Sequence, residues 1–424
     1  MIRSALLICI ALATASGVSA CGSDAKPVLN QPANESGLRF DGDYSGSGPG
    51  TLVSATNLPT VDLRLRAITS VAARVTYQST SGVDDSPTTV SGTVFIPKGK
   101  APEGGWPVIA YGHATTGILE ECAPSLSPTL LGVSDLISGL VRGGYAVTMS
   151  DYQGLGMKGA PHPYLDATTE GYNLIDSVRA ARKLSGDLSD RYVAVGGSQG
   201  GQAAWAANEL APKYGNGLTM LGSASFSPPA DIEGFADAAA AGQLTEEQST
   251  ALMAILESLS RSHPDFKLDD YRHGIVKEKW DVLLSCQGDA AAAAERTKAL
   301  DEMTPDDLRP SSPEAVEVLR GYLQRSTLPR GAAAAPMLVI YGGQDQFISP
   351  VWTDRALERA CRMGDVIQIQ LQPGAGHGDL DNGAAVAWIA ARFNNEPAPD
   401  DCQAFLASNE PPAEAAPQPP VEGQ

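Results

Sequence analysis

One serine stands between glycines where a predicted strand gives way to a predicted helix. The apolar run Tyr192–Val195 leads into Gly-Gly-Ser-Gln-Gly-Gly, and helix-forming residues 202–207 follow. In an elbow of this kind, the sharp turn exposes the serine hydroxyl, and a Cβ at Gly196 or Gly200 would collide with neighbouring backbone. The alternative is a tight glycine-rich turn with a bystander serine. The strand before it and the helix after it favour a nucleophilic Ser198.

A nucleophilic serine needs a base, and a carboxylate that orients the base. Among the five histidines only His377 follows a predicted strand after the elbow, and glycines flank it. Asp345 comes directly after the preceding strand, so the order along the chain is serine, aspartate, histidine. Asp365 and Asp379 are alternative carboxylates, but the post-strand position favours Asp345. The alternative role for His377 is that of a surface loop histidine.

Two further loops are predicted to reach the same edge. The main-chain amide of Gln199 is the expected donor to an oxyanion formed beside the serine. The predicted strand 106–111 is followed by the loop 112–117. In folds with such an elbow, this loop provides the second main-chain amide of the oxyanion site. Asp151 follows the predicted strand 145–150, and we expect it to order its loop rather than to act chemically.

The elements that position these residues alternate between strand and helix. An antiparallel hairpin over 74–79 and 88–97 opens the folded region. After it, strands are predicted at 106–111, 145–150, 192–195, 218–224, 336–341 and 366–371, and helices at 128–142, 168–184 and 383–393. This alternation predicts an α/β fold with a mostly parallel, doubly wound sheet, whose ligand site lies at the carboxyl ends of the strands.

The β runs are absent from residues 232–330, where helices are expected at 245–261, 290–303 and 313–324. We interpret this region as a helical cap or lid inserted between two parts of the core, 58–231 and 331–407. Such an insertion can cover a site and shape an acyl pocket. The alternative is a helical excursion packed on the side of the sheet.

Both ends of the chain differ from the core in composition. Residues 1–21 resemble an export signal, with Arg3 before an apolar stretch and small residues before Cys21. Val-Ser-Ala-Cys has the form of a lipobox, which predicts a lipid-modified Cys21; the alternative is ordinary cleavage nearby. Residues 22–57 are expected to form a flexible tether, with structure starting near Val61, and 408–424 a disordered tail.

Composition excludes several kinds of partner and cofactor. The net charge of −19 and the lack of a basic run argue against nucleic acid. Cys122, Cys286, Cys361 and Cys402 suggest two disulfides in an exported protein, with three possible pairings. No Cys-x-x-Cys spacing supports zinc or thiol redox chemistry.

The segments Tyr111–Thr116, Glu121–Ser125 and Ser150–Asp151, with the elbow and the Asp345 and His377 segments, resemble the secretory lipase family of the fungal lipase A type. The resemblance runs from about Trp106 to Cys402. It implies an α/β-hydrolase fold with a lid and a serine ester hydrolase without cofactor. It also implies disulfides Cys122–Cys286 and Cys361–Cys402.

His113 stands where fungal members carry an acidic residue, so the second oxyanion donor is expected to be the amide of His113 or Ala114, or the imidazole. The predicted reaction is hydrolysis of lipid or smaller carboxylic esters by an exported enzyme, either secreted or held to the cell envelope by its lipid anchor alone. The alternatives are a serine peptidase or amidase on the same fold, and a non-catalytic envelope binding lipoprotein. Acyl length and oligomeric state are left open.

Overall fold

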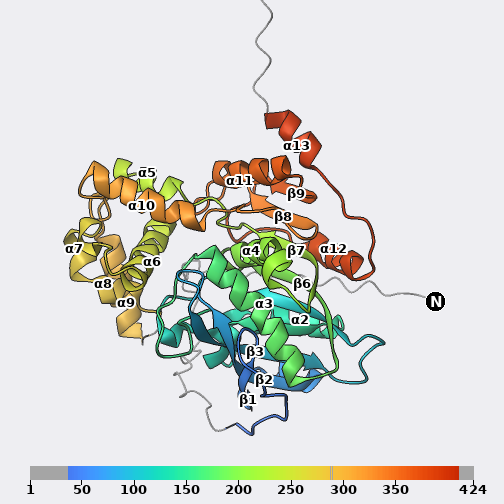
Figure 1. Cartoon of the computed structure of the whole chain (residues 1–424). Coiled ribbons are helices and arrows are strands. Elements are labelled where there is room, and N and C mark those ends of the chain that lie inside the picture. Colours follow the sequence, from blue (N-terminus) through green and yellow to red (C-terminus); the bar gives the residue numbers. More distant parts are fainter. Residues whose placement is uncertain (1–36, 287, 289, 410–424) are drawn as a thin grey trace, which may run out of the picture.

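The protein is built around one nine-stranded sheet, with strand order β1-β2-β3-β5-β4-β6-β7-β8-β9 (Figure 1). The computed structural model describes residues 37–286, 288 and 290–409. The predicted export signal, lipid-modified Cys21, residues 22–36 of the predicted tether and residues 410–424 of the predicted tail therefore lie outside the described residues. The predicted α/β-hydrolase fold with its mostly parallel sheet is confirmed.

The sheet has an antiparallel and a parallel part. The strands are β1 (Leu52–Asn57), β2 (Thr69–Thr80), β3 (Pro87–Pro97), β4 (Trp106–Gly112), β5 (Ala146–Ser150), β6 (Leu188–Gly197), β7 (Thr219–Phe226), β8 (Met337–Gly342) and β9 (Ile367–Gln372). The pairs β1–β2, β2–β3 and β3–β5 are antiparallel, and all pairs from β5–β4 to β8–β9 are parallel. The carboxyl ends of β4 to β9 therefore share one edge.

Helices cover both faces of the sheet because successive strand residues point to opposite sides. On β6, Tyr192 and Ala194 pack toward α3 (Ala167–Leu184) and α4 (Gln199–Tyr214), whereas Val193 and Val195 face the other side. That second face is covered by α1 (Leu63–Ile68), α2 (Ser134–Arg142) and α12 (Gly383–Phe393). The continuous apolar strands thus contribute to two separate cores.

The region between β7 and β8 forms a helical body beside the sheet (Figure 1). Its helices are α5 (Gly234–Ala241), α6 (Glu246–Ser262), α7 (Gly274–Glu278), α8 (Trp280–Leu284), α9 (Ala290–Asp301), α10 (Pro313–Ser326) and the short 3₁₀ turn η4 (Leu268–Asp270). They enclose a core of their own, with Leu252, Leu256 and Leu319 fully buried. The two ends of this region meet, since the N–H of Leu328 donates to the carbonyl of Ala230 at 2.6 Å.

Two sequence expectations at the start of the chain are wrong. Structure begins before Val61, because β1 pairs with β2 and buries Leu52 and Ala55 within the range assigned to the tether. The helix expected over 128–142 starts only at Ser134. It is preceded by the 3₁₀ turns η1 (Glu120–Cys122), η2 (Pro124–Leu126) and η3 (Leu130–Gly132). All three residues of η3 have positive φ, which interrupts a right-handed helix.

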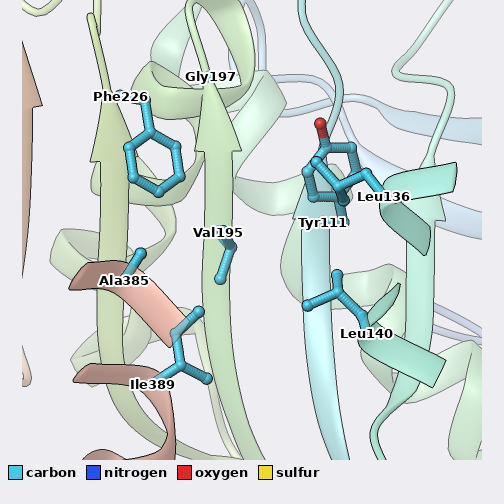
Figure 2. A pocket seen from close by; sticks show the side chains of 8 residues that line it. All are labelled: Tyr111, Leu136, Leu140, Val195, Gly197, Phe226, Ala385 and Ile389. Carbon is cyan, nitrogen blue, oxygen red and sulfur yellow. The ribbon is translucent and has the colours of Figure 1, made fainter. Parts of the chain in front are cut away.

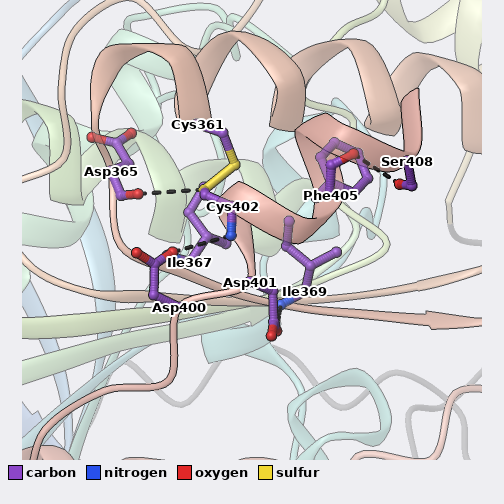
Figure 3. Close-up of a disulfide and its surroundings, with 9 residues drawn as sticks. All are labelled: Cys361, Asp365, Ile367, Ile369, Asp400, Asp401, Cys402, Phe405 and Ser408. Atoms are coloured by element: carbon purple, nitrogen blue, oxygen red, sulfur yellow. Dashed lines mark hydrogen bonds between the residues drawn. A yellow bond between two sulfur atoms is a disulfide. The ribbon is translucent and has the colours of Figure 1, made fainter. Parts of the chain in front are cut away.

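The chain ends on a helix that a disulfide holds. Cys361, on α11 (Pro350–Met363), is bonded to Cys402, the first residue of α13 (Cys402–Asn409) (Figure 3). The other disulfide joins Cys122 to Cys286. Both pairs are those that the family resemblance implies. Helix α11 was not predicted, and α13 extends two residues into the predicted tail.

Candidate active site

Ser198 lies between β6 and α4 in a strained turn. Its φ of 53° and ψ of −125° are unusual for a residue with a side chain. A Cβ at Gly196 would lie 2.3 Å from the carbonyl carbon of Gly200, and one at Gly200 would lie 1.9 Å from the carbonyl oxygen of Gly112. The Ser198 N–H donates to the carbonyl of Phe226 at 2.8 Å. The glycines are therefore required by close backbone packing, as the sequence predicts.

The structure brings His377 to Ser198 and Asp345. His377 Nε2 lies 2.9 Å from the Ser198 Oγ, and its Nδ1 lies 2.8 Å from Asp345 Oδ2. The other carboxylate oxygen of Asp345 accepts hydrogen bonds from the N–H groups of Phe347 and Ile348, each at 2.8 Å. The Asp345 side chain is 2 % exposed and the His377 side chain 21 %. This geometry allows an imidazole to take the serine proton while a fixed carboxylate orients it.

The rival carboxylates occupy other places. Asp365 Oδ1 accepts a hydrogen bond from the N–H of Ala333. Asp379 is exposed, and the Nδ1 of His377 is occupied by Asp345. Asp151 is fully buried and binds the Oγ of Ser91 at 2.6 Å and the N–H of Ser125 at 2.9 Å. It thus links β3 to the loop after β4.

The loop that follows β4 reaches the elbow through Gly112. The imidazole of His113 is buried, with Nδ1 2.7 Å from the carbonyl oxygen of Ala114 and Nε2 3.3 Å from that of Asp151. Burial lowers the pKa of His113, which favours the neutral ring. Since both ring nitrogens face protein carbonyls, main-chain amides are the better donors from this loop. The first residue of α4, Gln199, has a main-chain N–H with no acceptor inside the helix.

The loop that carries Asp345 is held by the helical region. At the start of α6, the side chain of Thr245 donates to the carbonyl of Gln346 at 2.9 Å, and that of Gln248 donates to the carbonyl of Phe347 at 3.1 Å. The same two residues form the capping box of α6. The ring of Phe347 packs edge-on against His377, with centroids 4.7 Å apart. Residues of the insertion therefore hold the loop whose Phe347 ring contacts the imidazole.

Two buried polar residues that sequence reasoning missed lie behind the elbow, in contact with the side chain of Gln199. The Gln199 side-chain nitrogen contacts Glu170 Oε1 at 2.7 Å and His162 Nε2 at 3.1 Å. In the sequence, His162 precedes a proline in a polar stretch, and nothing local marks it. Glu170 is spaced four and eight residues before Leu174 and Val178, which puts a carboxyl on the apolar face of the predicted helix. That spacing indicates burial but does not identify a partner. Only the close packing of α3 against α4 brings them together.

A small cavity lies in the core, on the face covered by α2 and α12 (Figure 2). Its lining is mainly aliphatic and aromatic: Tyr111, Leu136, Leu140, Val195, Gly197, Phe226, Ala385 and Ile389. It presents no charged group that could orient an ester, so it is a packing void.

The described residues include no group of three or more His, Cys, Asp or Glu side chains that could hold a metal ion. Within the same residues, no helix is long and apolar enough to span a membrane.

Comparison with protein families identifies the chain. The model of the secretory lipase family matches residues 126–401, more than half of the sequence. The chain belongs to the secretory lipase family. As a secretory lipase it is a carboxylic ester hydrolase of the lipase and esterase class, and lipid esters are the substrates that this family implies. A search of curated protein sequences gives no match.

Solved structures share the fold of this secretory lipase. Candida antarctica lipase A in its closed state matches with a TM-score of 0.66 and 16 % identity, over 85 % of this chain and 90 % of that chain. The rice cell wall degrading esterase LipA from Xanthomonas oryzae matches with a TM-score of 0.62 and 23 % identity, over 85 % and 97 %. A putative hydrolase from Legionella pneumophila matches with a TM-score of 0.62 and 19 % identity, over 85 % and 100 %.

Proposed function

We propose that this secretory lipase hydrolyses acyl esters through a triad of Ser198, His377 and Asp345. The observation that carries the proposal is the single imidazole that contacts the serine hydroxyl at 2.9 Å on one side and the carboxylate at 2.8 Å on the other. Few side chains besides histidine can accept a proton from serine and return it near neutral pH.

In the proposed reaction, Ser198 Oγ attacks the acyl carbonyl carbon while its proton moves to His377 Nε2. The negative charge on the former carbonyl oxygen is stabilised by the N–H of Gln199 and by an N–H from His113 or Ala114. The imidazolium then protonates the leaving alcohol as the carbon–oxygen bond breaks. A water molecule, deprotonated by His377, attacks the acyl-enzyme and releases the carboxylic acid. Asp345 keeps the imidazole oriented in both steps.

The helical region 232–330 is proposed to act as a cap over this site. Two contacts support that role: α6 hydrogen-bonds the loop after Asp345, and the Cys122–Cys286 disulfide ties the region to the loop after β4. We also propose export and attachment to the cell envelope through a lipid on Cys21, since a lipobox-like Val-Ser-Ala-Cys ends the predicted signal. Metabolic labelling with a fatty acid, lost in Cys21→Ala, tests the anchor.

The decisive test is hydrolysis of p-nitrophenyl esters of increasing acyl length by the purified domain lacking residues 1–21, beside Ser198→Ala. We expect the variant to lose at least 10³-fold in kcat with an unchanged fold. Equal activity in the variant would contradict the triad. Peptide anilides in the same assay test the amidase alternative, and labelling by a serine-directed phosphonate tests the non-catalytic one.

A further inference from the structure

The side chain of Gln199 points into the protein rather than toward the Ser198 hydroxyl. Its nitrogen lies 2.7 Å from Glu170 Oε1 on α3 and 3.1 Å from His162 Nε2. The three residues are at most 2 % exposed. Because buried polar groups are costly unless they are paired, such a set holds its members in one arrangement.

The hydrogen-bond directions in this set can be assigned. His162 Nδ1 lies 2.8 Å from the carbonyl oxygen of Gln153, which can only accept, so Nδ1 carries the proton. Burial lowers the pKa of His162 to about 3, and the ring is neutral with a lone pair on Nε2. The two hydrogens of the Gln199 side-chain nitrogen then go to His162 Nε2 and Glu170 Oε1. A flipped amide would place its oxygen against both acceptors.

Among the described residues, Glu170 is buried without a cationic partner. Its Oε1 also accepts a hydrogen bond from the N–H of Leu165 at 3.0 Å. Glu170 Oε2 and Gln199 Oε1 have no hydrogen-bond partner within the described part of the chain. Burial raises the pKa of Glu170 well above its usual value, and the nearby charge of Asp166 adds to this. This shift favours the neutral carboxylic acid over the carboxylate at Glu170.

The main-chain N–H of Gln199 opens α4, where helix geometry leaves it free to face a ligand. Two things limit the orientation of this peptide group: the strained turn at Ser198 on one side and the anchored side chain of Gln199 on the other. The anchoring of the side chain is supported by the close contact between α3 and α4, because a Cβ at Gly171 on α3 would lie 3.0 Å from the Ala207 nitrogen on α4. Helix α3 thus presents Glu170 to Gln199 from a fixed distance.

We propose that Glu170 and His162 are positioning residues for ester hydrolysis, and that they act through the Gln199 side chain to aim its main-chain N–H at the oxyanion. This inference rests on the proposed function, in which that N–H is an oxyanion donor. Loss of an entire donor from such a site costs on the order of 10² to 10³ in kcat. A misdirected donor should cost less, roughly 10-fold to 100-fold.

The test compares Glu170→Leu with Glu170→Gln in steady-state hydrolysis of one soluble p-nitrophenyl ester. We expect Glu170→Leu to lower kcat by roughly 10-fold to 100-fold and to change KM by less than about threefold, because the oxyanion forms after binding. Glu170→Gln should stay within about threefold of the wild type in kcat. Its amide oxygen can accept from Gln199 and Leu165 as Glu170 Oε1 does, and its nitrogen takes the place of Oε2.

Controls separate positioning from general destabilisation. Glu209, a largely buried carboxyl farther along α4, contacts the N–H of Arg330, and Glu209→Leu should leave kcat unchanged. Gln199→Leu keeps the main-chain amide, so it provides a second measurement if Glu170→Leu does not fold. It should lose kcat to a similar extent, with no further loss in the double variant.

Three results would overturn the inference: unchanged kcat in Glu170→Leu, unchanged kcat in Gln199→Leu, or an equal loss in Glu170→Gln and Glu170→Leu. Ser198→Ala, measured in parallel, distinguishes this failure from failure of the proposed function. If Ser198→Ala is inactive and Glu170→Leu is fully active, the triad stands and only the positioning role is wrong.

Discussion

Ser198 adopts a backbone conformation that most residues avoid, and its neighbours maintain it. Its φ is 53°, and glycines on both sides allow β4, β6 and α4 to approach one another. Such strain persists only where surrounding contacts over-determine it. Asp345 is constrained in another way, by two main-chain N–H groups on one carboxylate oxygen and an imidazole on the other. At the residue scale, the site consists of groups that have little freedom to reorient.

Asp345→Asn should lower kcat by about 10⁴-fold, as the loss of the orienting charge does in other serine triads. The Asn oxygen would accept from the N–H groups of Phe347 and Ile348, which places its NH₂ against His377 Nδ1. That nitrogen must then carry the lone pair, and Nε2 carries the proton, so it cannot accept one from serine. Kinetics of p-nitrophenyl ester hydrolysis measure the effect. The exposed Asp379→Asn is the matched control, and a larger loss there would contradict the assignment of the acid.

A second prediction concerns stability and pH. Burial raises the pKa of Glu209 from 4.5 to about 7. Between these values the unfolded chain loses the proton and the folded one keeps it, so Glu209 reduces stability as pH rises from about 4.5 to 7. The loss is at most about 3 kcal/mol. Urea unfolding at pH 4.5 and 7.5 measures the free energy of unfolding of the wild type and of Glu209→Gln. We expect this free energy to fall less between the two pH values in the variant. An identical fall would show that the Glu209 carboxyl does not titrate in this range.

At the scale of elements, the first turn of α6 and the loop after β8 form one unit. Thr245 and Gln248 cap the helix with their side chains and hydrogen-bond the carbonyls of Gln346 and Phe347. That loop carries Asp345, and its Phe347 ring lies against His377. This end of α6 is therefore fixed to the loop that carries Asp345.

Gln248→Ala should lower kcat by about threefold to tenfold. It removes one contact to the loop and half of the capping box, so the loop can shift by tenths of an ångström and reposition Asp345. Thr250→Ala, at a half-buried position of the same helix, should have no effect and controls for the change in helix propensity that alanine brings. Ester hydrolysis is measured together with far-ultraviolet circular dichroism. Equal kcat in both variants would show that the loop is rigid without α6.

At the scale of the whole molecule, two cores are joined at several points. The sheet core and the core of the helical region are linked by the chain near residues 230 and 328 and by the Cys122–Cys286 disulfide. Helix α6 adds hydrogen bonds from Thr245 and Gln248 to the loop after β8, and from Ser258 to the carbonyl of His162. Cys122 and Cys286 are 164 residues apart, whereas Cys361 and Cys402 are 41 apart. The longer connection restricts the unfolded chain more strongly.

Replacing Cys122 and Cys286 together by serine should therefore destabilise the protein more than replacing Cys361 and Cys402. Chain entropy alone predicts a difference of about 1 kcal/mol, with a typical loss of about 2 to 4 kcal/mol for either pair. Guanidinium unfolding of both double variants measures the difference. Limited proteolysis should also cut residues 232–330 earlier in the first variant. A greater loss in the second would mean that local packing around α13 outweighs chain entropy.

Much of this arrangement could be predicted from local sequence. Ser198, Asp345 and His377 each follow an apolar strand, and parallel strands present their carboxyl ends at one edge, so strand position and chain order select them. Tertiary structure alone decided the rest. Strand β1 has a polar, glycine-rich approach, and only its pairing with β2 buries Leu52 and Ala55.

The set of Glu170, His162 and Gln199 shows the physical reason most clearly. Local periodicity places a residue on a strand or a helix and on one of its faces. It carries no information on which buried polar groups meet across 29 or 37 residues of chain. Helix packing determines those contacts, and so the residues behind the proposed oxyanion donor were found only in the folded protein.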